Sequence, residues 1–218
     1  VVAIEVGISP GHRGPRGLAT AQSILRYCGK PIPCVVGEGQ DFGWGGLQRH
    51  RYPQPVGSRW LSHVDVPERA LWEARYPNLE VATVRAGLEV GFLHLGLSAL
   101  SRLVRLGLLE SLTPCARAFL SVADACNGLG SDAGAMHVTV TMRQETNELL
   151  RRTWTVIATR GDGPQIPATP AALLVKKLLA LPGYAPLTVR GALPCIGLVT
   201  IDEILRELRE LAIRTVVS

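Results

Sequence analysis

The stretch MHVTVTM, residues 136–142, alternates strictly between apolar and polar side chains. Successive side chains of a β-strand point to opposite faces of a sheet, so this pattern predicts a strand with one apolar and one polar face. A second β-branched run, residues 153–158, follows the polar segment 144–148. Two strand-like runs joined by a short polar loop are typical of a hairpin, so we expect an antiparallel pair at the centre of the fold.

Outward from this hairpin, the remaining sequence alternates between strand and helix signals. We expect further strands at 1–8, 32–36, 56–64 and 80–86, and loops at 37–46 and 161–167. Expected helices cover 17–27, 65–75, 90–109, 114–126 and 170–181, with another after Thr200. The expected caps of four of them are Asp65, Thr113, Thr169 and Thr200. This order predicts an α+β fold with a mixed, largely antiparallel sheet packed with helices.

Composition supports a globular chain with a substantial core. Of 218 residues, 47% are hydrophobic and 19% are charged, and the 23 Gly and 15 Pro are too few for a low-complexity chain. The length suits one domain over residues 1–218. The chain begins at Val1 without an initiator Met, so we expect it to be a part of a longer protein whose upstream portion is absent.

Charge and cysteine usage exclude several function classes. The net charge of +5 is spread along the chain, and nucleic-acid binders usually cluster such charge, so we expect no nucleic-acid partner. The apolar segment 90–109 contains Arg102 and Arg105, which favours a core or interface helix over membrane contact. The five cysteines form no C-x-x-C pair and no secretory signal precedes them, which predicts a reducing compartment, the cytoplasm.

The segment GISPGHRGPRGL, residues 7–18, is the first candidate site. A strand ends there, a Ser-Pro-Gly turn follows, and a helix begins, so free backbone N–H groups and basic side chains would attract an anion such as a carboxylate or phosphate. His12 is the candidate acid or base, because imidazole titrates near neutral pH. The candidate substrate-binding residues of this segment are Ser9, Gly11, Arg13 and Arg16. An ordinary Gly/Pro-rich connection with exposed arginines remains the alternative.

A second candidate group follows the Gly-rich segment 37–46. Arg51 and Tyr52 would lie beside a strand that carries Trp60 and His63, and aromatic, Arg and His side chains near Gly-rich loops are typical of ligand pockets. Anchoring of the loops is the alternative interpretation. The histidines show no H-E-x-x-H spacing, so we expect no metal site.

Four segments together resemble saccharopine dehydrogenases. GISPG at 7–11 is similar to their G-L-D-P-G, and YCGKPIP at 27–33 is similar to their S-Y-C-G-G-L-P-A-P. Residues 170–179 resemble their P-A-A-x-x-A-x-x-L-L-L helix, and GALP at 191–194 resembles their closing G-V-L-P. The segments occur in the same order and cover most of the chain.

The resemblance implies the C-terminal substrate-binding and dimerisation part of an NAD(P)-dependent oxidoreductase of unassigned substrate. In that family a preceding Rossmann domain binds NAD or NADP, so we expect this chain alone to be inactive and to hold no cofactor. Expected partners are a carboxylate-bearing small molecule and a second copy of the chain. Ser9 replaces the family's Asp, so the role of that Asp does not transfer to it. A non-catalytic binding or assembly module derived from the same domain is the alternative.

Overall fold

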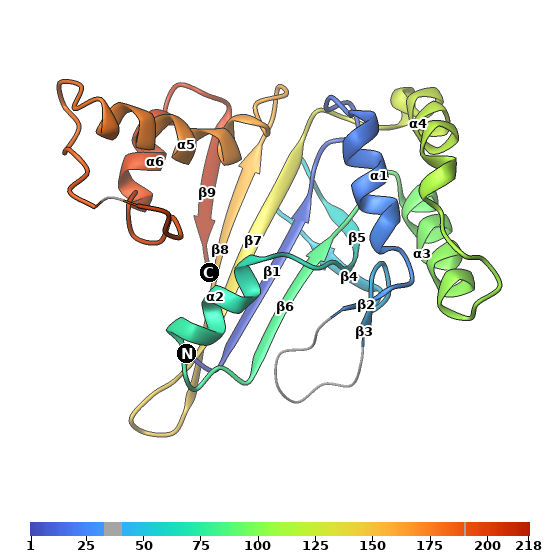
Figure 1. The fold of residues 1–218 in the computed structure, drawn as a ribbon, viewed down its shortest axis with the longest axis horizontal. Helices are drawn as coiled ribbons and strands as arrows, with labels where there is room; N and C mark the ends of the chain where they lie inside the picture. Colours follow the sequence, from blue (N-terminus) through green and yellow to red (C-terminus); the bar gives the residue numbers. More distant parts are fainter. Residues whose placement is uncertain (33–40, 190) are drawn as a thin grey trace.

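A computed structural model describes residues 1–32, 41–189 and 191–218 of the chain (Figure 1). Seven strands form one sheet in the order β4-β5-β6-β1-β7-β8-β9, in which only β1 and β6 are parallel. The strands of this sheet are β1 (Ala3–Ser9), β4 (Gln48–Arg51), β5 (Ser58–His63), β6 (Val81–Ala86), β7 (Gly134–Arg143), β8 (Leu149–Ala158) and β9 (Ile213–Val217). A second, two-stranded sheet pairs β2 (Pro31–Ile32) with β3 (Asp41–Phe42).

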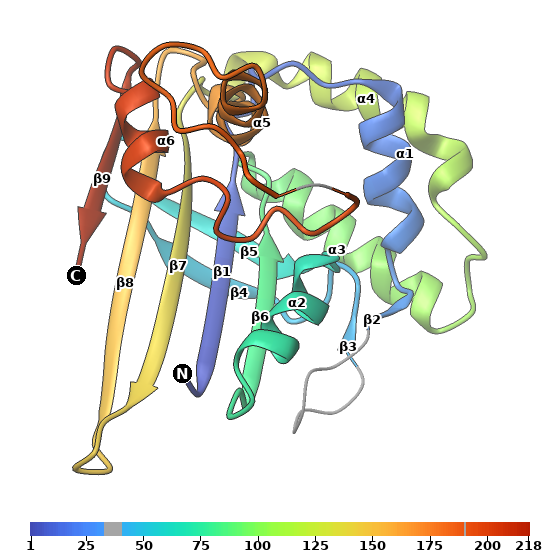
Figure 2. The same ribbon diagram turned by 60° about the vertical axis from the view of Figure 1, so that its left-hand side comes forward.

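The helices gather in groups around the large sheet (Figures 1 and 2). They are α1 (Leu18–Tyr27), α2 (Glu68–Arg75), α3 (Gly91–Arg105), α4 (Ala116–Ala125), α5 (Gln165–Leu178) and α6 (Ile201–Glu207). The helices α1, α3 and α4 lie at one end of the sheet, α5 and α6 lie near β8 and β9, and α2 covers β1 and β6. The mixed, mostly antiparallel sheet with its helices confirms the predicted α+β class.

The central hairpin forms as its alternation predicts. β7 and β8 pair antiparallel over their whole lengths, from Gly134 with Ala158 to Arg143 with Leu149. Val138 belongs to the apolar cluster around Ile4, which the α2 side chains Trp72 and Tyr76 cover. The intervening polar residues of β7 point to the opposite face of the sheet because side chains alternate along a strand. Sequence periodicity thus determines which face of the sheet is polar.

The β4–β5 hairpin runs across this polar face, behind the other strands in Figure 2. Tyr52 and Val56, at the turn of the hairpin, are 2% exposed each and pack against Ala135 and Ile157 of the sheet. The polar face is therefore covered at one end by the hairpin and its apolar turn. Away from this turn, the polar side chains of β4, Gln48 and His50, face those of β7, His137 and Thr139.

A separate apolar cluster joins the helices to the sheet. Leu25 of α1, Trp44, and Leu97 and Val104 of α3 are buried together. Burial of a large aliphatic side chain stabilises a fold by about 1.5–3 kcal/mol, so this cluster anchors the helical end. The expected helix 90–109 is α3, which ends at Arg105, and Leu108 beyond it is 69% exposed.

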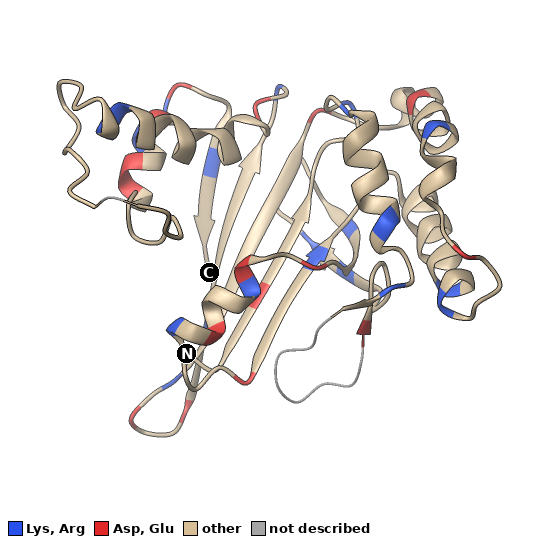
Figure 3. Ribbon diagram, viewed as in Figure 1, with Lys and Arg blue, Asp and Glu red and all other residues tan. Residues whose placement is uncertain are grey.

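Basic and acidic residues are distributed over most elements of the fold. Figure 3 shows Lys and Arg on helices and strands at both ends of the sheet, with Asp and Glu between them. Within the described ranges, no helix is long and apolar enough to cross a bilayer.

Several local sequence predictions need correction, and most of them concern helix starts. Thr113 does not cap a helix: it begins the 3-10 turn Thr113–Cys115, and α4 follows from Ala116. α2 begins at Glu68 with Pro67 as its N-cap and no side-chain cap, so the capping role predicted for Asp65 is wrong. α5 begins at Gln165, so the expected loop 161–167 is confirmed only as far as Pro164, and the helix start at Pro170 is wrong. Thr169 donates its hydroxyl proton to the Gln165 carbonyl (2.8 Å) inside this helix instead of capping it. The sequence predicts neither β4 nor β9.

The start of the last helix is confirmed, whereas the expected helices 90–109 and 170–181 end earlier, at Arg105 and Leu178. Thr200 forms the predicted capping box with Glu203 at the start of α6. Of the expected strand 32–36, only Ile32 lies in the described part, at the end of β2. The expected loop 37–46 is described from Asp41 onward, where β3 lies; residues 33–40 are outside the described ranges.

Candidate functional site

The carboxylate of Glu89 organises the first candidate segment. It accepts hydrogen bonds from the backbone N–H of His12 (2.7 Å) and from the backbone N–H and hydroxyl of Ser131 (2.8 and 2.7 Å). It also pairs with the Arg59 guanidinium at 2.8 Å, and both side chains are about nine-tenths buried. Burial acts to raise the pKa of Glu89, but the hydrogen bonds from Ser131 and His12 and the Arg59 charge lower it overall. Glu89 is therefore ionised, and it connects the turn after β1 to Arg59 of β5 and to Ser131 before β7.

The ring of His12 is engaged at both nitrogens. Its Nε2 lies 2.8 Å from the carbonyl oxygen of Ala123, so Nε2 carries the proton and donates it. Its Nδ1 lies 3.1 Å from a guanidinium nitrogen of Arg16, which donates to it. The ring is 6% exposed. These contacts hold the turn against α4, and the catalytic role expected for His12 stays a prediction.

The other candidates of this segment also contact protein groups. Arg16 pairs with Asp124 at 3.3 Å, and Arg13 donates to the carbonyl of Asn127 at 3.3 Å. Ser9 is fully buried, and a Cβ atom at Gly11 would lie 2.7 Å from the backbone of Asp132, so both are packed inside the turn. The two arginines thus hold the end of α4, and their role in binding an anion stays a prediction.

The second candidate group is divided between the two faces of the β4–β5 hairpin. Arg51 is exposed, Trp60 lies under the guanidinium of Arg49 at 5.8 Å, and His63 contacts Asp41. Tyr52 is buried, and its hydroxyl lies 3.0 Å from Nδ1 of His137. The hairpin does bring these strands together: Tyr52 contacts His137 of the polar face, and His63 is the cross-strand partner of Arg85.

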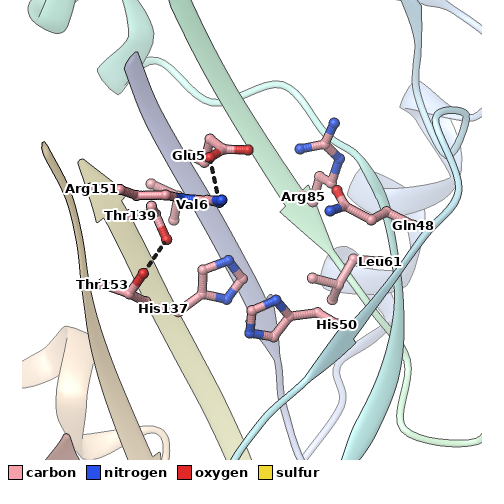
Figure 4. A pocket seen from close by; sticks show the side chains of 10 residues that line it. All are labelled: Glu5, Val6, Gln48, His50, Leu61, Arg85, His137, Thr139, Arg151 and Thr153. Carbon is pink, nitrogen blue, oxygen red and sulfur yellow. Dashed lines mark hydrogen bonds and ion pairs between the residues drawn. The ribbon is translucent and has the colours of Figure 1, made fainter. Parts of the chain in front are cut away.

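A polar pocket of about 80 Å³ lies on that face, between the sheet and β4 (Figure 4). The volume is several times what one water molecule needs and well below that of pockets for drug-sized ligands. Its lining comes from six strands: Glu5, Val6, Gln48, His50, Leu61, Arg85, His137, Thr139, Arg151 and Thr153. None of these residues is among the preferred candidates from the sequence, although Gln48 and His50 precede Arg51 and Tyr52 in the same pocket-like segment.

Two histidines from distant parts of the chain stack at one end of this pocket. The rings of His50 and His137 are 3.8 Å apart between centroids and 9° from parallel. Burial raises the pKa of Tyr52, so its hydroxyl stays protonated and shares one hydrogen bond of 3.0 Å with Nδ1 of His137. The Nε2 atom of His137 is the ring nitrogen that this bond leaves for a ligand. Figure 4 shows the His137 ring between the ring of His50 and the Arg151 side chain.

Charged and hydroxyl groups line the rest of the pocket. Arg151 pairs with Glu5 at 2.9 Å, and Arg85 donates to the hydroxyl of Thr83 at 3.0 Å. The hydroxyls of Thr139 and Thr153 share a hydrogen bond of 2.9 Å across β7 and β8. In Figure 4, Arg85 and Gln48 lie on the side away from these threonines. With neutral histidines the two guanidinium groups and one carboxylate give the lining a net positive charge.

Burial and neighbouring charges favour the neutral form of both histidines. The pKa of His137 is lowered to about 4; burial is the largest cause, and the charges of the neighbouring His50, Arg151 and Arg85 act in the same direction. Burial and Arg151 also lower the pKa of His50, while Glu5 opposes them. At neutral pH the pocket therefore offers N–H and O–H donors, two guanidinium groups and one carboxylate. This arrangement can bind a small anion.

A buried Ser62–His94 pair has a structural role. The backbone N–H of Leu88 donates to Nδ1 of His94 (3.2 Å), so the ring proton is on Nε2. This Nε2 lies 3.0 Å from the hydroxyl of Ser62 and donates to it. A base for a serine nucleophile would have to accept that hydroxyl proton, so the pair does not form a catalytic dyad.

The described residues contain no group of three or more His, Cys, Asp or Glu side chains that could hold a metal ion. Of the cysteines, the four that the structure describes are free thiols. Comparisons with known protein families and with curated protein sequences find no match to this chain.

Proposed function

We propose that this chain is the substrate-binding and dimerisation part of a saccharopine-dehydrogenase-like, NAD(P)-dependent oxidoreductase, and that its substrate places a carboxylate in the polar pocket. The observation that carries the binding role is the presence of two guanidinium groups, Arg85 and Arg151, in one small pocket. Guanidinium groups bind carboxylates through charge-assisted and often bidentate hydrogen bonds.

The size and donors of the pocket support this choice of ligand. A volume of about 80 Å³ accommodates a carboxylate group, with the remainder of the substrate outside. Gln48 and the Thr139–Thr153 pair add uncharged hydrogen-bonding groups. Glu5 shares Arg151 with the ligand, because a carboxylate at this position competes with it for the same guanidinium. Binding is therefore moderate rather than tight.

The redox part of the proposal rests on the resemblance. The order of the four similar segments supports descent from saccharopine-dehydrogenase-like enzymes, and the α+β architecture is compatible with it. In this proposal the nicotinamide cofactor is bound by a dinucleotide-binding domain outside this chain, and hydride passes between it and an imine or carbonyl substrate. The enzyme acts in the cytoplasm, where free thiols such as those described here persist.

The proposed homodimer has support from exposed apolar side chains. Leu178 and Leu179 at the end of α5 are 67% and 65% exposed, and Val217 of the edge strand β9 is 68% exposed. Such groups are often covered by a partner. Light scattering of the chain should give twice the monomer mass, and a monomer at high concentration would contradict this part of the proposal.

A non-catalytic binding module is the second candidate, and one observation favours it. Both ring nitrogens of His12 contact protein groups, so the expected acid or base has no nitrogen directed at a substrate. Replacing Arg13 and Arg16 with Ala in a protein that carries both domains separates the candidates. Loss of turnover would support an enzymatic site at this turn, whereas unchanged turnover would favour the binding module.

The carboxylate pocket itself is tested by NMR titration of the 218-residue chain with acetate. We expect shifts confined to the pocket, at least tenfold weaker binding of uncharged acetamide, and a similar loss of acetate affinity in Arg85→Gln and Arg151→Gln. Arg152→Gln is the matched control, because Arg152 is the next residue of β8 and is exposed. Equal effects of the Arg151 and Arg152 variants, or equal binding of acetate and acetamide, would refute the pocket.

A further inference from the structure

The stacked histidines can take up a proton, so ligand binding in the polar pocket can depend on pH. His50 is on β4 and His137 is on β7, so the stack joins the covering hairpin to the sheet. Their centroid distance of 3.8 Å lets two neutral rings stack, but two imidazolium ions at that distance would repel strongly. Groups that interact this closely titrate as a pair, so the stack accepts one proton well before a second.

Every element around the stack contributes to its electrostatics. Glu5 of β1 is the one carboxylate in the lining, whereas Arg85 of β6 and Arg151 of β8 are cationic. Leu61 of β5 and Gln48 of β4 are uncharged, and the Tyr52 hydroxyl shares a hydrogen bond with Nδ1 of His137. Arg59 of β5 is the strand partner of His50, and its charge is paired with that of Glu89. A first proton on the stack would therefore face two guanidinium groups against one carboxylate. The empty pocket disfavours that proton.

A bound anion reverses this balance. A carboxylate near Arg85, Arg151 and the Nε2 edge of His137 adds a negative charge and a hydrogen-bond acceptor close to the stack. An opposite charge within hydrogen-bonding distance favours the charged form of an imidazole. When His137 becomes an imidazolium, both of its ring nitrogens carry protons, and the Tyr52 hydroxyl then accepts from Nδ1. The site therefore has a place for the added proton.

We propose that this pocket takes up one proton together with its anion, and that the His50–His137 stack holds the proton. The inference rests on the carboxylate pocket proposed above and adds its regulation by pH. The ligand binds as the carboxylate, the proton comes from solvent, and no covalent bond changes. Binding is then stronger at acidic pH, and the anion is released as the pH rises.

Formate is a suitable probe because it is small and remains ionised between about pH 5 and pH 7. Its affinity is measured by NMR at several pH values and fixed ionic strength. One linked proton strengthens binding by up to about tenfold for each pH unit of decrease. The double variant His50→Gln/His137→Gln should bind formate with little pH dependence. A pH dependence equal to that of the wild type in this variant would overturn the proposal.

A second measurement on the unmodified protein does not depend on the folding of the variant. The Cε1–H resonances of His50 and His137 are followed against pH with and without saturating formate, and those of His94, outside the pocket, are the control. A formate-dependent rise in the titration midpoint of the pair supports the proposal. Formate binding that leaves the midpoint unchanged overturns the proton coupling but not the carboxylate pocket, whereas absence of binding at every pH overturns both.

Discussion

Gly7 and His137 are directly paired across β1 and β7, and the imidazole of His137 lies over the α-carbon of Gly7. A Cβ atom at Gly7 would lie 2.2 Å from Cε1 of His137 and 2.9 Å from Cδ1 of Leu61. No side chain larger than hydrogen fits there without moving the ring. The absence of a side chain on β1 therefore lets His137 reach both His50 and Tyr52.

We expect Gly7→Ala to displace the ring of His137 and to open the stack. The substitution should destabilise the fold by about 1–3 kcal/mol, because it overpacks a closely packed site. It should also weaken carboxylate binding. Urea denaturation and the acetate titration measure the two effects.

Gly96→Ala is the control for this substitution. Gly96 lies within α3, and a Cβ atom there would meet no atom within 4 Å. Alanine is the better helix former by about 0.5–1 kcal/mol, so this variant should be more stable than the wild type. A Gly7→Ala variant as stable as the wild type, with unchanged His137 resonances, would contradict the packing argument.

The Glu89 carboxylate should be among the most sensitive polar groups of the fold. Glu89→Gln keeps the size of the side chain but removes the charge that faces Arg59 and one of the acceptors for Ser131 and His12. Removing one partner of a buried, hydrogen-bonded ion pair should lower the free energy of unfolding by about 2–4 kcal/mol. Chemical denaturation at neutral pH measures it.

Glu80→Gln provides the comparison for Glu89. Glu80 pairs with Arg143 at 3.2 Å, but the two side chains are 64% and 47% exposed. Exposed pairs contribute about 0–1 kcal/mol, so this variant should resemble the wild type. Similar losses in the two variants would show that Glu89 is not the buried hub that its contacts indicate.

The pocket illustrates what periodicity does and does not reveal. The alternation in residues 136–142 correctly predicts a strand whose polar face carries His137 and Thr139. It does not reveal what covers that face, because β4 consists of Gln-Arg-His-Arg and has no apolar residue to signal a strand. The stack joins positions 50 and 137, and such a long-range contact depends on how the hairpin crosses the sheet. A polar residue such as His137 in the middle of an alternating strand is the one local signal available.

The helices show a similar division between local and tertiary control. Thr200 and Glu203 cap α6 as predicted, because both hydrogen bonds of a capping box form within four residues. At α5 the sequence Thr169-Pro170 has the same local appearance as a helix start, yet the helix begins at Gln165. Leu173 is 1% exposed, so packing holds this helix, and the missing N–H of Pro170 is tolerated inside it. Tertiary burial overrides the local start signal.

The capping box gives a local prediction for α6. Thr200→Ala removes the hydroxyl that accepts from the backbone N–H of Glu203 at 3.3 Å, and should cost about 1 kcal/mol. The loss should be seen as faster amide hydrogen exchange in α6, with β7 and β8 unaffected. Thr146→Ala, in the exposed β7–β8 loop, should leave exchange in α6 unchanged. Unchanged exchange in α6 of Thr200→Ala would contradict a stabilising role of this cap.

The free energy of unfolding should decrease at acidic pH, and the buried His94 should contribute to this decrease. This side chain is fully buried, and burial lowers its pKa from 6.5 to about 4. Because the folded pKa is below the unfolded one, the unfolded chain binds the proton first as the pH falls. The stabilising contribution is therefore complete above about pH 6.5 and is lost progressively between about pH 6.5 and pH 4.

His94→Gln isolates this contribution from that of His137, whose pKa is also lowered to about 4. Urea denaturation at a series of pH values should show the wild type losing up to about 1.4 kcal/mol for each pH unit from each buried histidine. The variant should be less stable at neutral pH, because the amide does not reproduce the hydrogen bonds of His94 with Leu88 and Ser62. The difference in the free energy of unfolding between wild type and variant should then become smaller as the pH falls. The reason is that only the wild type must keep an unprotonated imidazole at position 94. A gap that stays constant down to about pH 4 would mean that His94 does not enter the folded protein as a neutral group.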